Sequence, residues 1–143
     1  MPLSLRRGLV VPIAGAALVL AGVGSASADQ LTREQVYQVA AAAFPGDQLD
    51  TAVNVAWCES RFDTGARAPY GYTGLWQIDP AIHGWRAEAL FGPSASLTDP
   101  KVNAAVAAQI VAEQGWRPWP VCAGLAWGWG PTGARDPSAE AEL

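Results

Sequence analysis

Glu59 is the residue whose position in this sequence best suits acid catalysis. It lies near the predicted end of an apolar helix, within residues 57–63 (WCESRFD), which place aromatic side chains on both sides of it. A helix dipole disfavours a carboxylate at the C-terminal end, and neighbouring rings exclude water from it. Both effects raise the pKa of a carboxyl group, as a general acid at near-neutral pH requires. The alternative is a solvated glutamate at a helix end.

Aromatic residues are the second group with a possible chemical role. The chain has seven tryptophans, too many for the core of one small domain. Flat aromatic faces stack on the apolar faces of sugar rings, so some of these residues are candidates for lining a sugar-binding groove. We expect this role for Trp76 and for nearby Tyr72, and we expect three or four tryptophans in the core. Trp127 and Trp129 lie in a Gly-rich stretch and fit either interpretation.

Helices must position these residues. The first predicted helix begins after Thr32, where a capping box with Gln35 is expected, and it stops at residues 45–46 (PG). The second runs from residue 47 or 48 to Ser60, so that Glu59 lies at its end.

A third helix is predicted from Pro100, with Asp99 just before it, to Gly115. Between the second and third helices, residues 61–84 contain several glycines and a proline. This composition predicts turns and short extended pieces.

The N-terminus has the features of a secretory signal peptide. Arg6 and Arg7 precede an apolar run over residues 8–24, and residues 26–28 (ASA) supply the small side chains before a cleavage site. A membrane anchor is the alternative, but the run is short for a bilayer core of about 30 Å. The expected organisation is a signal peptide, one domain and a disordered tail, at residues 1–28, 29–132 and 133–143.

Charge and cysteine content restrict the partners. The formal net charge is −4, and an acidic chain lacks the basic face that nucleic acid requires, so we expect no nucleic acid partner. Under the oxidising conditions of export, Cys58 and Cys122 are expected to form a disulfide that adds about 4 kcal/mol on the chain-entropy model. A metal or redox site is the alternative. Because there is no CxxC motif and His83 is the single histidine, we expect neither metal nor cofactor.

Three motifs, in order, resemble those of the soluble lytic transglycosylase family. Residues 57–63 and 74–78 (GLWQI) resemble its Glu-Ser and Gly-Leu-Met-Gln motifs, and residues 97–104 (LTDPKVNA) are similar to its Asp-Pro-x-x-Asn segment. The cysteine placement and residues 119–122 (WPVC) also resemble resuscitation-promoting factors, cell-wall enzymes of the same superfamily. Together the matches span about residues 50–122.

The resemblance implies a mainly α, goose-type-lysozyme-like domain with a substrate cleft and a short irregular or β-like segment. It implies cleavage of the β-1,4 bond between N-acetylmuramic acid and N-acetylglucosamine in peptidoglycan glycan strands. Glu59 would protonate the glycosidic oxygen, and Ser60 would orient this acid or the substrate. Gln77 would contact the sugar, and Asn103 would lie at the edge of the cleft. Taken alone, the last three have structural interpretations: a helix-end hydroxyl, a turn residue and a first-turn polar residue.

The resemblance also bears on a second carboxylate. Glycosidases usually need two, about 5–10 Å apart, and none of Asp63, Asp79 and Asp99 has a strong claim. Lytic transglycosylases use the N-acetyl group of the substrate instead and close a 1,6-anhydro ring. The family usually has an Ala-Tyr-Asn-x-Gly segment whose tyrosine lies near the acid, whereas residues 116–119 read WRPW. Arg117 or a tryptophan is expected in its place, and anhydro product and simple hydrolysis both remain open.

The sequence therefore predicts a secreted, monomeric enzyme of the cell wall, without stable membrane association once the signal peptide is removed. Two other functions remain. A non-catalytic wall-binding module would keep the groove without turnover. In a secreted structural or signalling protein, the tryptophans and the disulfide would serve stability alone.

Overall fold

Helix α1 (Arg33–Ala41) begins at the predicted capping box. The Thr32 hydroxyl accepts a hydrogen bond from the Gln35 amide at 3.2 Å, and the Gln35 side chain accepts one from the Thr32 amide at 2.9 Å. The structure is a computed structural model that describes residues 29–124. The predicted signal peptide, the predicted tail, Trp127 and Trp129 lie outside the described residues.

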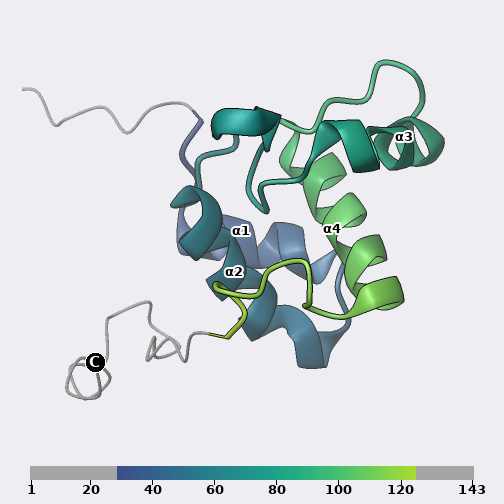
Figure 1. Ribbon diagram of the computed structural model, residues 1–143. Coiled ribbons are helices and arrows are strands. Elements are labelled where there is room, and N and C mark those ends of the chain that lie inside the picture. Colours follow the sequence, from purple (N-terminus) through teal and green to yellow (C-terminus); the bar gives the residue numbers. More distant parts are fainter. Residues whose placement is uncertain (1–28, 125–143) are drawn as a thin grey trace, which may run out of the picture.

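Helix α2 (Leu49–Ser60) follows a short 3-10 turn, η1 (Gly46–Gln48), close to the predicted bounds. It packs against α1 (Figure 1), which in turn contacts the last helix. Its buried face consists of Ala52, Val53, Val55 and Ala56. The helix ends at Arg61, whose φ of 54° is left-handed, so the chain changes direction just after Glu59.

The last two helices each begin at an Asp-Pro pair. Asp99 caps α4 (Pro100–Gln114), as predicted, and its Oδ1 accepts a hydrogen bond from the Lys101 amide at 2.9 Å. Asp79 caps α3 (Pro80–Phe91) in the same way, with the Ala81 amide at 2.9 Å. Proline suits the first turn of both helices, because the amide hydrogen it lacks would have no intrahelical partner there.

Helix α3 corrects the prediction that residues 61–84 are turns throughout. The turn-rich segment ends at Asp79, and α3 packs against α4 (Figure 1). Of its 12 residues, Arg86 and Ala87 are buried, and Gly84 lies in its middle. A helix with so small a buried face has little apolar periodicity, which explains why the pattern did not predict it.

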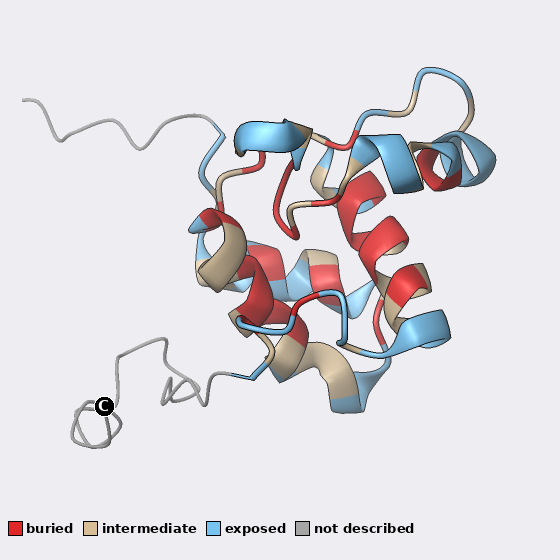
Figure 2. Cartoon of the chain, in the orientation of Figure 1, coloured by how far each residue is buried: buried red, intermediate tan, exposed pale blue. Residues whose placement is uncertain are grey.

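Residues 66–78 fold back on themselves between α2 and α3. Isolated β-bridges join Thr73 to both Arg67 and Ile78, in agreement with the expected short extended pieces, and a second 3-10 turn, η2 (Pro69–Gly71), lies in the same segment. The far end of this fold carries Leu75 and Trp76 into the core, where both side chains are fully buried. Figure 2 shows this buried stretch facing the buried side of α4. The core thus forms from helices on two sides and one inserted turn.

The predicted disulfide joins α2 to the loop that follows α4 (residues 115–124), here called the C-terminal loop. The Cα atoms of Cys58 and Cys122 lie 5.6 Å apart, and the bond links positions 64 residues apart in sequence. Within residues 29–124 no helix has the length and apolar content needed to cross a bilayer.

Candidate active site

Glu59 lies one residue before the end of α2, with its side chain half-buried. Burial raises the pKa of its carboxyl group above the ordinary 4.5, because the ionised form loses hydration there. Among residues 29–124, no group donates a hydrogen bond that would stabilise the carboxylate. Glu59 is therefore disposed to hold a proton, which is the property of a general acid.

The backbone beside Glu59 is unusual. Arg61 and Phe62 have φ values of 54° and 66°, which non-glycine residues rarely adopt. Trp57 and Phe62 pack edge to face with ring centroids 5.0 Å apart, and the Arg61 guanidinium lies 5.1 Å from the centre of the Trp57 ring. These contacts hold the strained bend, and backbone strain of this kind concentrates at functional sites.

Asn103 fixes the turn that carries Gln77. Its Oδ1 accepts a hydrogen bond from the Trp76 amide at 2.9 Å. Its Nδ2 donates to the Thr73 and Leu97 carbonyls at 2.9 and 2.8 Å. The side chain is fully buried, so Asn103 lies beneath the turn rather than at the edge of a cleft, where we expected it. It is a positioning residue that joins the first turn of α4 to residues 73–77.

Trp76 lies in the core, and the expectation that it lines a groove is wrong. Its side chain is 0 % exposed, its indole Nε1 donates to the Ala52 carbonyl at 3.0 Å, and its ring lies 5.5 Å from that of Phe44. The indole therefore joins the turn to α2, as Asn103 joins it to α4.

Gln77 and Tyr72 remain at the surface. Gln77 has a φ of 48°, and its Nε2 donates to the Gly74 and Ala66 carbonyls at 3.0 and 3.2 Å. These bonds fix the amide group, and among the described residues nothing donates to its oxygen. Tyr72 is 39 % exposed. Both residues line the smaller of the two hollows described below.

Ser60 has the structural role that we gave as its alternative, that of a hydroxyl group at a helix end. Its side chain is buried, and its hydroxyl donates to the Ala56 carbonyl one turn earlier in α2, at 2.8 Å. The hydroxyl oxygen keeps acceptor capacity, but the hydrogen bond ties the group to the helix end.

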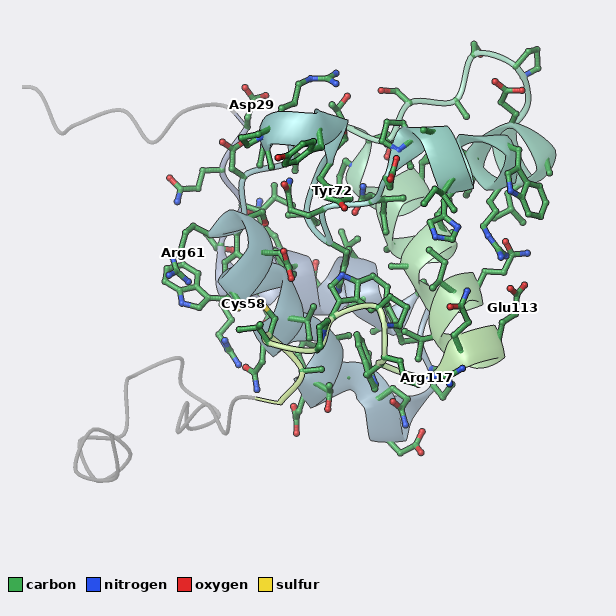
Figure 3. The ribbon with its side chains drawn as sticks, in the orientation of Figure 1. Asp29, Cys58, Arg61, Tyr72, Glu113 and Arg117 are labelled. Carbon is green, nitrogen blue, oxygen red and sulfur yellow. A yellow bond between two sulfur atoms is a disulfide. The ribbon has the colours of Figure 1, made fainter. Side chains whose placement is uncertain are left out.

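The residues that replace the expected tyrosine segment point in different directions. Trp119 is 5 % exposed and donates from Nε1 to the Trp76 carbonyl at 2.9 Å. Trp116 stacks on Phe44 with centroids 5.8 Å apart. Arg117 is exposed (Figure 3), and its Nε donates to the Gln114 carbonyl. Of these three, Trp119 is the residue in direct contact with the turn that bears Gln77.

A pocket of about 180 Å³ opens beside Gln77, between the turn, α3 and Trp119. Its lining is Tyr72, Gln77, Ile78, Asp79, Ile82, His83, Ile110, Pro118 and Trp119. A larger hollow of about 980 Å³ lies between α1 and α4. Neither Glu59 nor Gln77 lines this second hollow, and Lys101 is the one ionisable side chain among its lining residues. Glu59 does not line the smaller pocket either, but Gln77 does, so the smaller pocket is the one that adjoins the turn of the candidate site.

Sequence reasoning missed the polar cluster behind this pocket. Arg86, 6 % exposed, donates to His83 Nδ1 at 3.3 Å and to Gln109 Oε1 at 2.9 Å, and it forms a bidentate ion pair with Glu113. The Asp-Pro pair at residues 79–80, read like that at residues 99–100, was the available signal for the helix that carries it. Within residues 29–124, no group of three or more His, Cys, Asp or Glu residues is arranged to hold a metal ion.

Comparison with known proteins identifies a family. The model of the family described as SLT_3, Lysozyme like domain, matches residues 36–121. That interval contains Glu59, the turn with Gln77, and Asn103. No curated protein and no solved structure matches the chain.

Proposed function

Because the chain belongs to the SLT_3 lysozyme-like domain family, we propose that it is a peptidoglycan-cleaving enzyme with Glu59 as its acid. The substrate is the glycan strand, cut at the β-1,4 bond between N-acetylmuramic acid and N-acetylglucosamine. The observation that carries the proposal is the half-buried Glu59 carboxyl, whose pKa burial raises, at the end of α2. The disulfide fits a protein that works outside the cytoplasm, at the cell wall.

The proposed mechanism uses one carboxylic acid. Asp63, Asp79 and Asp99, the other carboxylates we considered, each accept a backbone N–H, from Gly65, Ala81 and Lys101 respectively. Each thus has a structural role in a turn or a helix cap. This leaves Glu59 without an evident carboxylate partner, which favours assistance by the substrate.

In this scheme, protonated Glu59 gives its proton to the glycosidic oxygen as the bond from that oxygen to C1 breaks. The carbonyl oxygen of the 2-acetamido group then bonds to C1 and stabilises the positive charge. In the last step the sugar's own 6-hydroxyl attacks C1, the bond to the acetamido oxygen breaks, and the Glu59 carboxylate takes the hydroxyl proton. A 1,6-anhydro sugar results, and the acid is restored. Attack by water at the same stage would give hydrolysis.

Replacement of Glu59 tests the proposal. We expect Glu59→Gln to abolish the clearing of a suspension of purified cell walls while leaving glycan binding intact, because the amide keeps the shape but has no proton to give. Glu88→Gln, at an exposed glutamate of α3, is the matched control and should clear walls like the unmodified protein. Clearing by Glu59→Gln at the normal rate would contradict the assignment of Glu59.

Two further results separate the alternatives. An unmodified protein that binds walls and never clears them would be a binding module, and one that does neither would be structural. For an active protein, mass analysis of the released fragments identifies the chemistry, because an anhydro product is lighter than the hydrolytic one by one water.

A further inference from the structure

The pocket beside Gln77 has a chemistry of its own, separate from that of Glu59. We propose that it binds the acetamido arm of an N-acetylated sugar, with His83 as the hydrogen-bond donor to the arm's carbonyl oxygen. The inference rests on the proposed function in assuming a glycan ligand. At about 180 Å³, the pocket is smaller than the 300–1,000 Å³ typical of sites for whole small molecules. It suits one substituent of a polymer that lies across the surface.

The lining of the pocket matches an acetamido group. The floor is apolar and buried, made by Ile78, Ile110 and Trp119, which are 2, 1 and 5 % exposed. Such a floor suits a methyl group, which gains free energy by leaving water. Polar side chains, including those of His83 and Asp79, share the same lining. A methyl group joined to a carbonyl and an N–H is a small group that uses both kinds of surface.

The hydrogen bonds of His83 fix which of its nitrogens carries the proton. Arg86 donates from Nε to His83 Nδ1 at 3.3 Å. A guanidinium has donors and no acceptor, so Nδ1 must be the acceptor and the proton of the neutral ring must be on Nε2. Burial, together with the charge of Arg86, lowers the pKa of His83, although Asp79 and Glu113 oppose this. His83, which lines the pocket, therefore keeps a neutral N–H at Nε2 that can donate a hydrogen bond to a carbonyl oxygen.

Helix α4 holds Arg86 in place. The guanidinium donates to Glu113 Oε1 at 2.7 Å and to Gln109 Oε1 at 2.9 Å. On its other side it lies 4.7 Å from the centre of the Trp85 ring. Figure 3 shows Glu113 near the end of α4. Arg86 is a positioning residue in this arrangement, because it acts on the ligand only through His83.

The pocket is connected to the Glu59 region through one loop. Trp119 forms part of the pocket floor, and the Ala123 amide donates to its carbonyl at 3.0 Å, closing a turn. Cys122, within that turn, is bonded to Cys58, the neighbour of Glu59. This loop therefore connects the pocket floor at Trp119 to the residue next to Glu59.

A pair of substitutions distinguishes a ligand-binding His83 from one that merely joins α3 to α4. In His83→Asn, the amide oxygen takes the place of Nδ1 and can still accept from Arg86, while the Nε2 donor is lost. In His83→Gln, the longer side chain returns an N–H donor near the Nε2 position. Both are made in the Glu59→Gln protein, so that ligand is bound and not cut. Glu88→Gln, on the same helix and outside the pocket, is the control.

Binding is measured by calorimetry with N-acetylglucosamine oligosaccharides and with their de-N-acetylated counterparts. We expect the parent protein to prefer the N-acetylated ligand. His83→Asn should weaken that preference about tenfold, the effect of one lost hydrogen bond, and His83→Gln should restore part of it. A His83→Asn protein that keeps the full preference while its melting temperature falls would overturn the proposal and leave His83 as a helix contact.

A second measurement needs no substitution at the pocket. His83 is the single histidine of the chain, so its imidazole gives one set of nitrogen resonances. We expect the Nε2 signal, in the Glu59→Gln protein, to shift when the N-acetylated oligosaccharide is added and to stay in place with the de-N-acetylated one. An unmoved signal with both ligands would refute the pocket. If the unmodified protein clears walls but the Glu59→Gln protein binds both oligosaccharides equally, the pocket proposal is wrong and the catalytic proposal stands. If binding depends on the acetyl group but the unmodified protein never clears walls, the catalytic proposal is wrong and the pocket proposal stands.

Discussion

The pKa of Glu59 links its burial to the pH dependence of both activity and stability. Because burial raises the pKa above 4.5, the carboxyl group of the folded protein keeps its proton to a higher pH than that of the unfolded chain. Catalysis as an acid needs this proton. We therefore expect activity to fall on the alkaline side as the pH rises through the raised pKa, and the midpoint of that fall measures the pKa directly.

Stability should change over the same pH range. The folded state binds the Glu59 proton more tightly than the unfolded state does, so this residue favours folding below about pH 4.5. That advantage is lost as the pH rises through the raised pKa. Glu59→Gln does not titrate, and its free energy of unfolding, relative to that of the unmodified protein, should rise across this interval. Denaturant titrations at several pH values measure the difference, and a difference constant with pH would contradict the raised pKa.

For single residues, the sequence could predict the position of Glu59 but not the roles of the residues around it. Its place at a helix end follows from local pattern, and the structure puts it there. Trp76 was expected in a groove because aromatic faces stack on sugar rings and its segment is rich in turns, and Asn103 was expected at the cleft edge because of the family resemblance. Their contacts instead lie far away in sequence, with Ala52 and Thr73 among the partners. Only tertiary packing decides whether such side chains face inward.

The turn over residues 73–77 is the element on which the candidate site depends, and Asn103 should be its most sensitive support. Asn103→Ala would leave the Trp76 amide and the Thr73 and Leu97 carbonyls without their partners in a buried place. We expect it to lower the free energy of unfolding by about 3 kcal/mol or more. Chemical denaturation measures this. Gln114→Ala, at an exposed position of the same helix, should change stability by no more than about 0.5 kcal/mol.

Gly74 is the second support of the same turn. Its φ of +79° disfavours any side chain, and an added Cβ would collide with Asn103 Nδ2 and the Leu97 carbonyl. Gly74→Ala should therefore cost about 2 kcal/mol or more and weaken glycan binding, since it displaces the turn that carries Gln77. Gly46→Ala has nothing within 4 Å of the new Cβ and serves as the control. Equal thermal stability of the two variants would contradict this account.

Helix prediction succeeded where end signals and apolar periodicity agreed. The capping box of α1 and the Asp-Pro start of α4 mark helices whose buried faces are clear from the sequence. Helix α3 has the same Asp-Pro start, but its buried face is mainly Arg86, an arginine buried because α4 supplies Glu113 and Gln109. A polar buried face has no apolar period to read. The polar cluster around Arg86 also contacts His83, which lines the pocket. The helix and the pocket were therefore missed for the same reason, because polar side chains replace the apolar pattern there.

For the whole molecule, a helical lysozyme-like domain could be predicted because its motifs occur in order along the chain, and the family match covers residues 36–121. The order of the motifs does not predict how the helices place the site residues relative to one another, because tertiary contacts decide this. Helix α2 supplies Glu59, α4 holds the turn through Asn103, and α3 supplies His83 to the pocket. The C-terminal loop crosses between these parts and is bonded to α2 at Cys58 (Figure 1). That loop therefore connects the two regions of the candidate site.

The disulfide should accordingly affect both the stability of the domain and the geometry of its site. It closes a loop of 64 residues, and a crosslink of this length stabilises a fold by about 4 kcal/mol on the chain-entropy model. The double variant Cys58→Ser, Cys122→Ser should lose about that much free energy of unfolding, measured by chemical denaturation. A reductant should lower the melting temperature of the unmodified protein and leave that of the variant unchanged.

The effect on the site can be separated from the effect on stability. Well below the variant's melting temperature the domain is still folded, but the turn that holds Trp119 has lost its attachment beside Glu59. We expect weaker binding of glycan oligosaccharides there, in proportion to how far the loop moves. Thiol titration of the denatured, unreduced protein should find no free thiol. Unchanged stability and unchanged binding in the double variant would show that the turn and α2 hold their positions without the crosslink, and that the two regions of the site are independent.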